Sequence, residues 1–289
     1  MTSKGQRRYA AQGIALGCRA DGRAGKDYRP LQLELAVVPQ ANGSARCLIG
    51  ASEVLVAVKV EVNVPEEDFP DQGVVHFSVE CSPCASAAFQ GRGALDLGAD
   101  MAGNLRRSVL GGSASMGGSL DLKALCIISG SRCWHVHVDG LVINADGSLL
   151  DALSIATRAA LTDLQIPRVD ISPSDDPEDE PEIELDDDPE HAASLDASRI
   201  PVVVTLAEAE GRPAVDLTAD EEASCPGPRV HVAVNGRGCI CGLHKQGNAP
   251  LQLEALQEML ALAQQLGPRL CKAVNAQCTA QLHGRRQHA

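Results

Sequence analysis

The chain has 289 residues, which allows one or two domains with ample core, and because only 2% of them are aromatic the core must be aliphatic. The formal net charge is −13, yet Asp170–Glu190 alone holds twelve acidic and no basic residues, so the remaining chain is close to neutral and does not exclude RNA as a partner. No apolar run reaches the roughly 18 residues of a membrane span, and the N-terminal stretch lacks an apolar signal region. We therefore expect a soluble intracellular protein with no membrane partner, whose eleven cysteines are reduced thiols.

Two N-terminal segments precede the first expected strand. Residues 3–14 predict a short helix anchored by Tyr9 and Ile14. Residues 19–30 are dense in charge and contain the Asp21-Gly22 step that is common in turns, so we expect an exposed turn.

Alternating apolar residues then predict a sheet that opens with antiparallel strands. The expected strands cover 31–38, 44–49, 54–64 and 74–81, with a hairpin turn signal at Asn42-Gly43. Residues 89–110 predict a Gly/Arg turn and then a helix, which carries Arg92, Arg106 and Arg107. Residues 111–119 are rich in Gly and Ser but lack the Lys-Ser/Thr ending of a nucleotide-binding P-loop, so we expect a flexible linker before a strand over 122–128.

Residues 136–164 form the central unit, a strand, a turn at Asp146-Gly147 and a helix. Ser148, with Asp151 three residues later, predicts a capping box at the helix start. The apolar residues that follow recur at helical spacing and predict one buried stripe. A turn that leads into a helix N-terminus is also a natural anion site.

The acidic stretch from residue 168 to 198 contains four prolines and few apolar residues, so we expect most of it to be a mobile linker, with 183–185 as one apolar island. The second half predicts strands over 201–207, 214–217, 230–234 and 238–243 and a long helix over 250–282, broken or kinked near Gly267 by Pro268. Both halves share one plan, several strands and then a helix. The fold class is therefore α+β, with two related lobes that each pack a mixed or antiparallel sheet against helices.

The order of motifs resembles the RNase PH-like subunits of the RNA exosome ring. The motifs that carry the resemblance are Tyr9…Gly13-Ile14, Arg19-Ala-Asp21-Gly22-Arg23…Asp27-Tyr28-Arg29, Gly43-Ser-Ala-Arg46, Val54–Lys59, Phe89-Gln-Gly91-Arg92-Gly93, Asp121–Ile127, Cys133-Trp134…Val138-Asp139, Ala159–Leu161, Ile166-Pro-Arg168, Glu182–Pro189 and Ile200-Pro201…Thr205. Each motif is weak alone, and the ordered set is specific.

The resemblance implies an N-terminal extension over 1–28, RNase PH-like domain 1 over 29–169, an acidic linker over 170–199 and RNase PH-like domain 2 over 200–289. It implies partners as well: other RNase PH-like ring subunits in a hetero-hexamer, RNA-binding cap subunits, and RNA in the central channel. The implied role is 3′-to-5′ RNA processing and degradation, including rRNA maturation and mRNA decay, in the nucleus, nucleolus and cytoplasm, with no cofactor.

Active relatives bind phosphate through a Thr-Arg pair at the start of the central helix, where a guanidinium and a helix N-terminus meet the anion. Leu149 and Leu150 occupy that place here and cannot bind phosphate. Active relatives also carry catalytic Asp residues in the second lobe, where Thr218 and Glu222 align here, although a shift of register would bring Asp220 or Glu221 into place. We therefore expect no catalytic residue and no enzymatic activity of this chain alone.

Arg107, together with Arg106, aligns with an arginine that active relatives use on the RNA backbone, and Arg92 lies in the adjacent Gly-Arg-Gly turn. Contacts to the RNA backbone need only charge and position, so they tolerate the loss of catalysis. We expect Arg92, Arg106 and Arg107 to contact RNA, while ordinary surface arginines on a helix explain the pattern equally well.

Cysteine and histidine patterns leave a metal site open but do not favour one. Cys81-Ser-Pro-Cys84 and Cys239-Ile-Cys241 lie in or beside expected strands, where buried structural thiols are the preferred interpretation. His135 and His137 share one strand face, with Asp139 following, and an exposed or interface-facing strand is preferred to a metal site. We expect no metal.

The leading hypothesis is thus a non-catalytic exosome ring subunit. One alternative is a phosphate-dependent 3′ exoribonuclease or nucleotidyltransferase that works as a homo-hexamer. Another is an adaptor that binds other proteins through the acidic residues 170–190.

Overall fold

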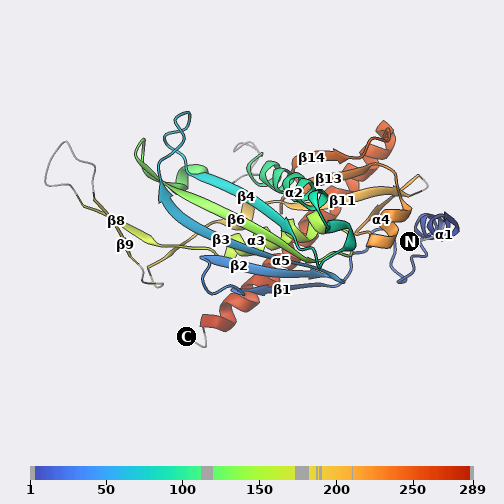
Figure 1. Cartoon of the computed structure of the whole chain (residues 1–289), viewed down its shortest axis with the longest axis horizontal. Helices are drawn as coiled ribbons and strands as arrows, with labels where there is room; N and C mark the ends of the chain where they lie inside the picture. The colour runs from blue at the N-terminus through green and yellow to red at the C-terminus, as the bar shows by residue number, and fades with distance from the viewer. Residues whose placement is uncertain are drawn as a thin grey trace.

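The computed structural model describes residues 4–111, 120–172, 182–186, 188, 191–209 and 211–286 (Figure 1). Its α-helices are α1 (Lys4–Leu16), α2 (Arg92–Leu110), α3 (Leu149–Asp163), α4 (Ala219–Ser224) and α5 (Leu253–Arg286), with short 3-10 turns η1 (Ala87–Phe89), η3 (Leu122–Leu125) and η4 (Ala197–Arg199). Its strands are β1 (Leu31–Leu35), β2 (Gly43–Ile49), β3 (Ser52–Asn63), β4 (Val74–Cys81), β5 (Cys126–Ile128), β6 (Arg132–Asn144), β7 (Gln165–Ile166), β8 (Arg168–Ser172), β9 (Glu182–Asp186), β10 (Ala193–Ser194), β11 (Val202–Ala209), β12 (Arg212–Val215), β13 (Arg229–Val234) and β14 (Ile240–Gln246). Among these described residues, no helix is long and apolar enough to cross a membrane.

The first lobe is a six-stranded sheet in the order β1-β2-β3-β6-β4, with β5 beside one end of β6. All neighbours are antiparallel except β4 and β6, which run parallel. β6 alternates strictly: Val136 and Val138 are buried, whereas His135 and His137 are half-buried on the opposite face. The sheet therefore has one core face and one open face.

The second lobe is a four-stranded antiparallel sheet in the order β12-β11-β13-β14. The four expected strands of the second half are all present. β11 and β13 are buried along almost their whole length. Helices α3 and α5 pack against β11, and α5 also packs against β13. The expected α+β fold with two sheet-and-helix lobes is confirmed.

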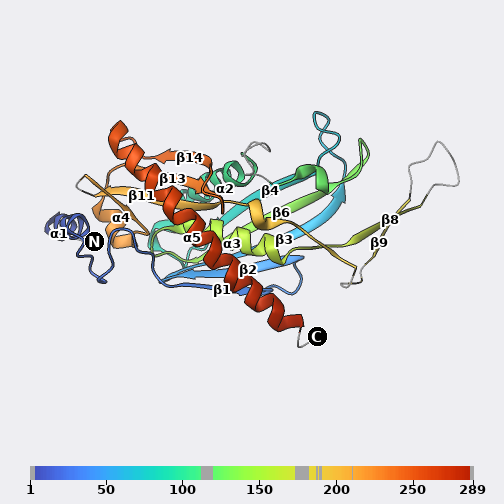
Figure 2. The ribbon, with the colours of Figure 1, turned by 180° about the vertical axis from the view of Figure 1, so that it is seen from behind.

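Helix α3 lies between the two sheets (Figures 1 and 2). It packs against β2 and β3 of the first lobe and against β11 of the second. The residues of the expected apolar stripe are buried or half-buried, but burial extends beyond the stripe to thirteen residues of the helix, because both faces of this helix meet protein. Arg158 is also buried, and its guanidinium donates to the carbonyl oxygens of Ile200 and Ser198 and to Asn275 Oδ1, which ties the two lobes together.

Helix α5 crosses the molecule from the second sheet to the edge of the first (Figure 2). The helix continues through Pro268, so the break that was one of the two expectations near Gly267 does not occur, and the kink stays a prediction. Gly267 is needed for packing instead: a Cβ there would lie 2.5 Å from Val234 Cβ. Farther along, Gln281 accepts from the Leu35 N–H at 2.8 Å, and Gln277 pairs with β1 in the same way. These glutamines satisfy an edge strand that would otherwise offer free backbone groups to another chain.

The acidic segment is only partly described. β8 and β9 pair antiparallel, with Ile171 opposite Ile183, where the composition predicted a mobile linker. This two-stranded ribbon projects from the body (Figure 1) and leaves Ile171 and Leu185 about half exposed. The remaining linker residues, 173–181, 187 and 189–190, lie outside the described part of the chain, so the expected mobility is not assessed there.

Candidate functional site

A pocket of about 270 Å³ opens at the start of α3, where the two lobes meet. The first lobe contributes the 145–150 turn and residues of α2, and the second lobe contributes residues of β11, α4, β13 and β14. Its lining includes Gly147, Ser148, Leu149, Leu150, Glu222 and Arg229. This is the place where the sequence predicted an anion site that had lost its ligands.

The anion position at the helix start is filled by a side chain of the protein. The backbone N–H of Ser148 donates to Glu222 Oε1 at 2.9 Å, and Arg229 Nη1 lies 3.2 Å from Glu222 Oε2. A carboxylate at a helix N-terminus, paired with a guanidinium, supplies the charge that a bound phosphate would supply. Leu149 and Leu150 line the same pocket, as predicted, and bring no polar group to it.

The predicted capping box at this helix is wrong. Ser148 is the N-cap residue, but it adopts a left-handed backbone with φ of 50° and its hydroxyl donates to the Leu217 carbonyl oxygen instead of accepting from the helix. Asp151 points into the core rather than back to the cap, and its carboxylate accepts from Thr205 and from Tyr28 Oη. The carboxylate that serves this helix start comes from another lobe, which local spacing cannot reveal.

The other acidic residues of the second-lobe motif serve structure. Glu221 accepts from Arg19 Nε at 2.9 Å and completes a capping box with Thr218 at the start of α4. Asp220 is exposed and does not line the pocket. Of Thr218, Asp220, Glu221 and Glu222, only Glu222 therefore places a carboxylate in the pocket.

The charged segment 19–30 has the predicted exposed turn at Asp21-Gly22, but two of its arginines are buried. Arg19 and Arg29 are only 4% and 7% exposed. Arg29 Nη2 lies 2.7 Å from Asp216 Oδ1, and its Nη1 donates to the carbonyl oxygen of Asp146 at 2.7 Å. Arg19 also donates to the Asp216 carbonyl oxygen. These buried arginines hold the turn before α3 against the second lobe, so they set the shape of the pocket.

A buried polar chain runs beside the pocket through Asp151, Thr205 and His231. The Thr205 hydroxyl donates to Asp151 and lies 2.8 Å from His231 Nδ1. Burial raises the pKa of Asp151 to about 7, against the lowering effect of the Thr205 hydrogen bonds. Burial lowers the pKa of His231 to about 4, so the imidazole is neutral at pH 7. The packing of α3 on β11 and the pairing of β11 with β13 bring these three side chains together, so no local sequence motif could have predicted the chain.

The two exposed arginines of α2 that were predicted to contact RNA have different surroundings. Arg106 is exposed and lines a hollow with Glu66 and Phe69. Arg107 is exposed too, but its Nη2 donates to Asn104 Oδ1 at 2.7 Å, and Asn104 lines the pocket at α3. Arg92 begins α2, and its side chain lies outside what the structure describes. Their contact with RNA stays a prediction.

The cysteine motifs and the histidine motif differ in whether they lie in a cluster that could hold a metal ion. All eleven cysteines are free thiols. Cys81 is buried and Cys84 exposed, and burial raises the pKa of Cys81 and of Cys241. In the described residues no cysteine belongs to a cluster able to hold a metal ion, whereas His135 and His137 are joined by His76 in such a cluster.

Two sheets lie around a shared helix, and the pocket opens at the start of that helix, where the lobes meet. The 3′ exoribonuclease family matches over residues 27–167 for its domain 1 and 199–265 for its domain 2. A chain of the archaeal exosome core has a TM-score of 0.72 at 23% identity, covering 94% of this chain and 97% of that one. A chain of the Archaeoglobus fulgidus exosome with RNA bound to the active site has the same TM-score at 24% identity, covering 93% and 98%. At this identity the two structures establish the fold alone.

The chain belongs to the 3′ exoribonuclease family. Within it, the sequence most resembles the ribosomal RNA-processing protein 42 type, also called exosome component 7, and its relatives confirm that resemblance. An exosome complex component Rrp42 of Methanosarcina acetivorans is 32% identical over 86% of this chain and 85% of that protein. A relative in Dictyostelium discoideum, 31% identical over 91% and 93%, is named both as an RRP42 of the exosome complex and as an exonuclease.

Proposed function

We propose that this chain is an exosome core subunit of the Rrp42 type, which takes part in RNA processing and degradation through assembly and RNA contact and performs no phosphorolysis by itself. Similarity to Rrp42 components over most of the chain supports the first part. The expected presence in nucleus, nucleolus and cytoplasm remains a prediction.

One observation carries the non-catalytic part of the proposal: the Glu222 carboxylate occupies the helix N-terminus of α3, between the Ser148 N–H and Arg229. A phosphate entering this site meets the Glu222 carboxylate, which already pairs with Arg229, and two leucines. Loss of single oxyanion contacts costs roughly 10²–10³ in rate, so a site whose one arginine is neutralised by a carboxylate and whose helix start carries two leucines should fall far below a working enzyme.

Incubation of the purified chain with single-stranded RNA and inorganic phosphate tests this proposal, with release of nucleoside diphosphates as the readout. We expect no release above the rate without protein. Phosphate-dependent release that disappears in Glu222→Gln, the carboxylate in the pocket, and persists in Asp220→Asn, its exposed neighbour on α4, would establish the alternative of an active exoribonuclease.

Assembly supplies a second test. Native mass spectrometry of the complex purified through this chain should show different subunits of similar size. A homo-oligomer would favour the homo-hexameric exoribonuclease instead. Changing the acidic residues of 173–181 to their amides should leave assembly intact, because it removes five of the twelve negative charges of the tract and keeps the chain length between β8 and β9; loss of assembly would favour the acidic adaptor.

For RNA contact, the two exposed arginines of α2 are the residues to change. Arg106→Ala with Arg107→Ala should weaken RNA binding by the assembled complex and reduce its salt dependence, since each phosphate contact releases counterions. Arg212→Ala, an exposed arginine on β12, is the matched control. Equal RNA binding by both variants would show that Arg106 and Arg107 are ordinary surface arginines that do not contact RNA.

A further inference from the structure

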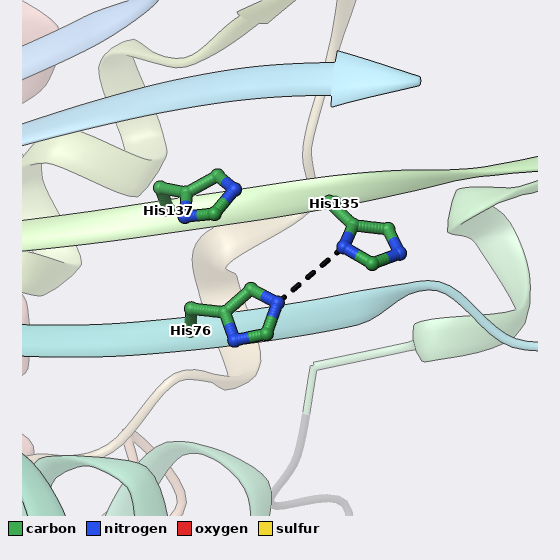
Figure 3. Close-up of side chains that lie close together, drawn as sticks. All are labelled: His76, His135 and His137. Carbon is green, nitrogen blue, oxygen red and sulfur yellow. Dashed lines mark hydrogen bonds between the residues drawn. The ribbon is translucent and has the colours of Figure 1, made fainter. Parts of the chain in front are cut away.

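Three histidines meet on the open face of the first sheet (Figure 3). β4 and β6 are parallel neighbours, and their register places His76 directly opposite His137. His135 stands two residues before His137 on the same face. The sequence suggested only the His135 and His137 pair, because His76 comes from a strand about sixty residues away that reaches them through the parallel pairing.

The ring nitrogens lie at distances that suit a bound metal ion. His76 Nε2 lies 3.4 Å from His135 Nδ1, and one nitrogen from each of the three rings lies within 4.8 Å of the others. Zn²⁺ binds imidazole nitrogen at about 2.0–2.1 Å in tetrahedral geometry, which puts two ligand nitrogens about 3.4 Å apart. The first edge of such a tetrahedron is therefore already present, and rotation of exposed side chains brings the third nitrogen closer.

Two of the rings are held from behind by oxygen acceptors. His135 Nε2 lies 3.0 Å from the Val64 carbonyl oxygen, which can only accept, so Nε2 carries the proton and Nδ1 carries the free lone pair. His137 Nε2 lies 3.0 Å from Glu61 Oε1, which fixes the same tautomer. Histidine ligands of metals usually donate their second ring N–H to a carbonyl or a carboxylate, which orients the ring and raises its basicity.

The chemistry of the three donors indicates which ion would bind. Imidazole, rather than carboxylate, is the donor that selects zinc and related first-row metals over Mg²⁺.

We propose that His76, His135 and His137 bind one Zn²⁺ ion on the open face of the first sheet, through three imidazole nitrogens and with Glu61 and the Val64 carbonyl supporting the rings. Three protein ligands leave the fourth tetrahedral position to water or to an oxygen or nitrogen group of a bound molecule. The site lies on the face of the sheet away from α3, so it is separate from the pocket at the start of that helix.

Equilibrium dialysis of the full chain against Zn²⁺, with metal measured by mass spectrometry, tests the proposal. We expect about one Zn²⁺ per chain, undiminished by excess Mg²⁺. His76→Gln and His137→Gln should each weaken binding at least tenfold, and Glu61→Gln, which removes only the supporting carboxylate, should weaken it about 10–100-fold.

Two matched controls keep the test specific. His244→Gln changes a half-buried strand histidine outside the cluster, and Glu80→Gln changes an exposed carboxylate on the same face of β4 as His76; both should bind Zn²⁺ like the wild type. Circular dichroism should be the same for all variants because all the changes are at exposed or half-buried side chains. Absence of a tightly bound Zn²⁺ in the wild type, or equal binding by the cluster and control variants, would overturn the proposal.

Discussion

The backbone N–H of Ser148 donates to Glu222 Oε1 at 2.9 Å, which joins the start of the central helix to the second lobe. The same carboxylate pairs with Arg229, so Glu222 makes an internal contact between the lobes at the helix start where the sequence suggested an anion site. The Ser148 N–H and the positive end of the helix dipole are thus met by a carboxylate of the protein itself. One residue therefore both joins the two lobes and occupies this helix start.

Glu222→Ala should destabilise the fold by about 1–2 kcal/mol, because it removes the charged cap of α3 and leaves Arg229 without its carboxylate. The midpoint of urea unfolding measures this change. Asp220→Ala, an exposed acidic residue on the same short helix, should change the unfolding free energy by less than about 0.5 kcal/mol. Equal effects would mean that the Ser148 contact contributes nothing to stability.

The ion pair of Arg29 and Asp216 is a second contact between the lobes, and the Asp216 side chain is fully buried. Arg29→Ala should cost about 3–5 kcal/mol, since it removes one of the two guanidinium groups that pair with this buried carboxylate and leaves Arg23 as the other. Replacing both, as Arg29→Met with Asp216→Asn, should cost less than Arg29→Ala alone, because the neutral amide still offers an acceptor to Arg23 and to the backbone N–H of residue 29 and no buried carboxylate has lost its partner. A double replacement that is worse than the single one would contradict this account.

Arg46 provides the comparison for that experiment. It pairs with Glu34 and Glu53 on the open face of the first sheet, where its side chain is 35% exposed. Arg46→Ala should cost much less than Arg29→Ala, because solvent screens these pairs. The contrast with Arg29 would show that burial, and not the number of ion pairs, decides the contribution.

Asp151 predicts an unusual pH dependence of stability. Its pKa is about 7 in the folded protein, whereas an exposed Asp has a pKa of about 3.9. Between these values the folded state holds a proton that the unfolded state releases, so the contribution of Asp151 to stability falls as pH rises from about 4 to 7. Asp151→Asn should abolish this fall, which amounts to about 1.4 kcal/mol per pH unit at most.

The measurement is the unfolding free energy of both proteins at several pH values from 4 to 7.5. His231, whose pKa is lowered to about 4, contributes with the opposite sign, since its stabilisation is lost as pH falls from about 6.5 to 4. It is present in both proteins, so the difference between them isolates Asp151. Parallel curves would mean that Asp151 is ionised in the fold throughout this range.

Sequence patterns predicted the strands well, because the period of two in β3 and β6 reports directly which face is buried. They predicted α3 as a helix but not its burial on both sides, since only the second sheet explains why Asp151 and Arg158 are inside. The break at Pro268 failed for a related reason: packing of α5 across both lobes outweighs the one backbone hydrogen bond that proline removes.

The residues of the candidate site could be predicted only where they are close in sequence. Leu149 and Leu150 were placed correctly, because the Asp146-Gly147 turn and the helix that follows are adjacent in sequence. Glu222 as a cap, Arg29 on Asp216 and His76 beside His137 were not predicted. Each joins segments more than fifty residues apart, and their meeting depends on sheet order and register rather than on spacing along the chain.

Gly147, at the turn before α3, gives the last prediction. It has φ of 79°, and a Cβ there would lie 2.2 Å from the Leu217 carbonyl oxygen of the second lobe. Gly147→Ala therefore combines a strained left-handed backbone with a clash, and should destabilise by more than the roughly 1 kcal/mol that strain alone costs. Gly130→Ala, with φ of 81° and open space around it, carries the strain without the clash. Thermal unfolding measures the loss of stability in both variants, and a larger loss in Gly147→Ala than in Gly130→Ala reports how closely the two lobes meet at this turn. Equal losses would show that the second lobe shifts to make room for the added methyl group.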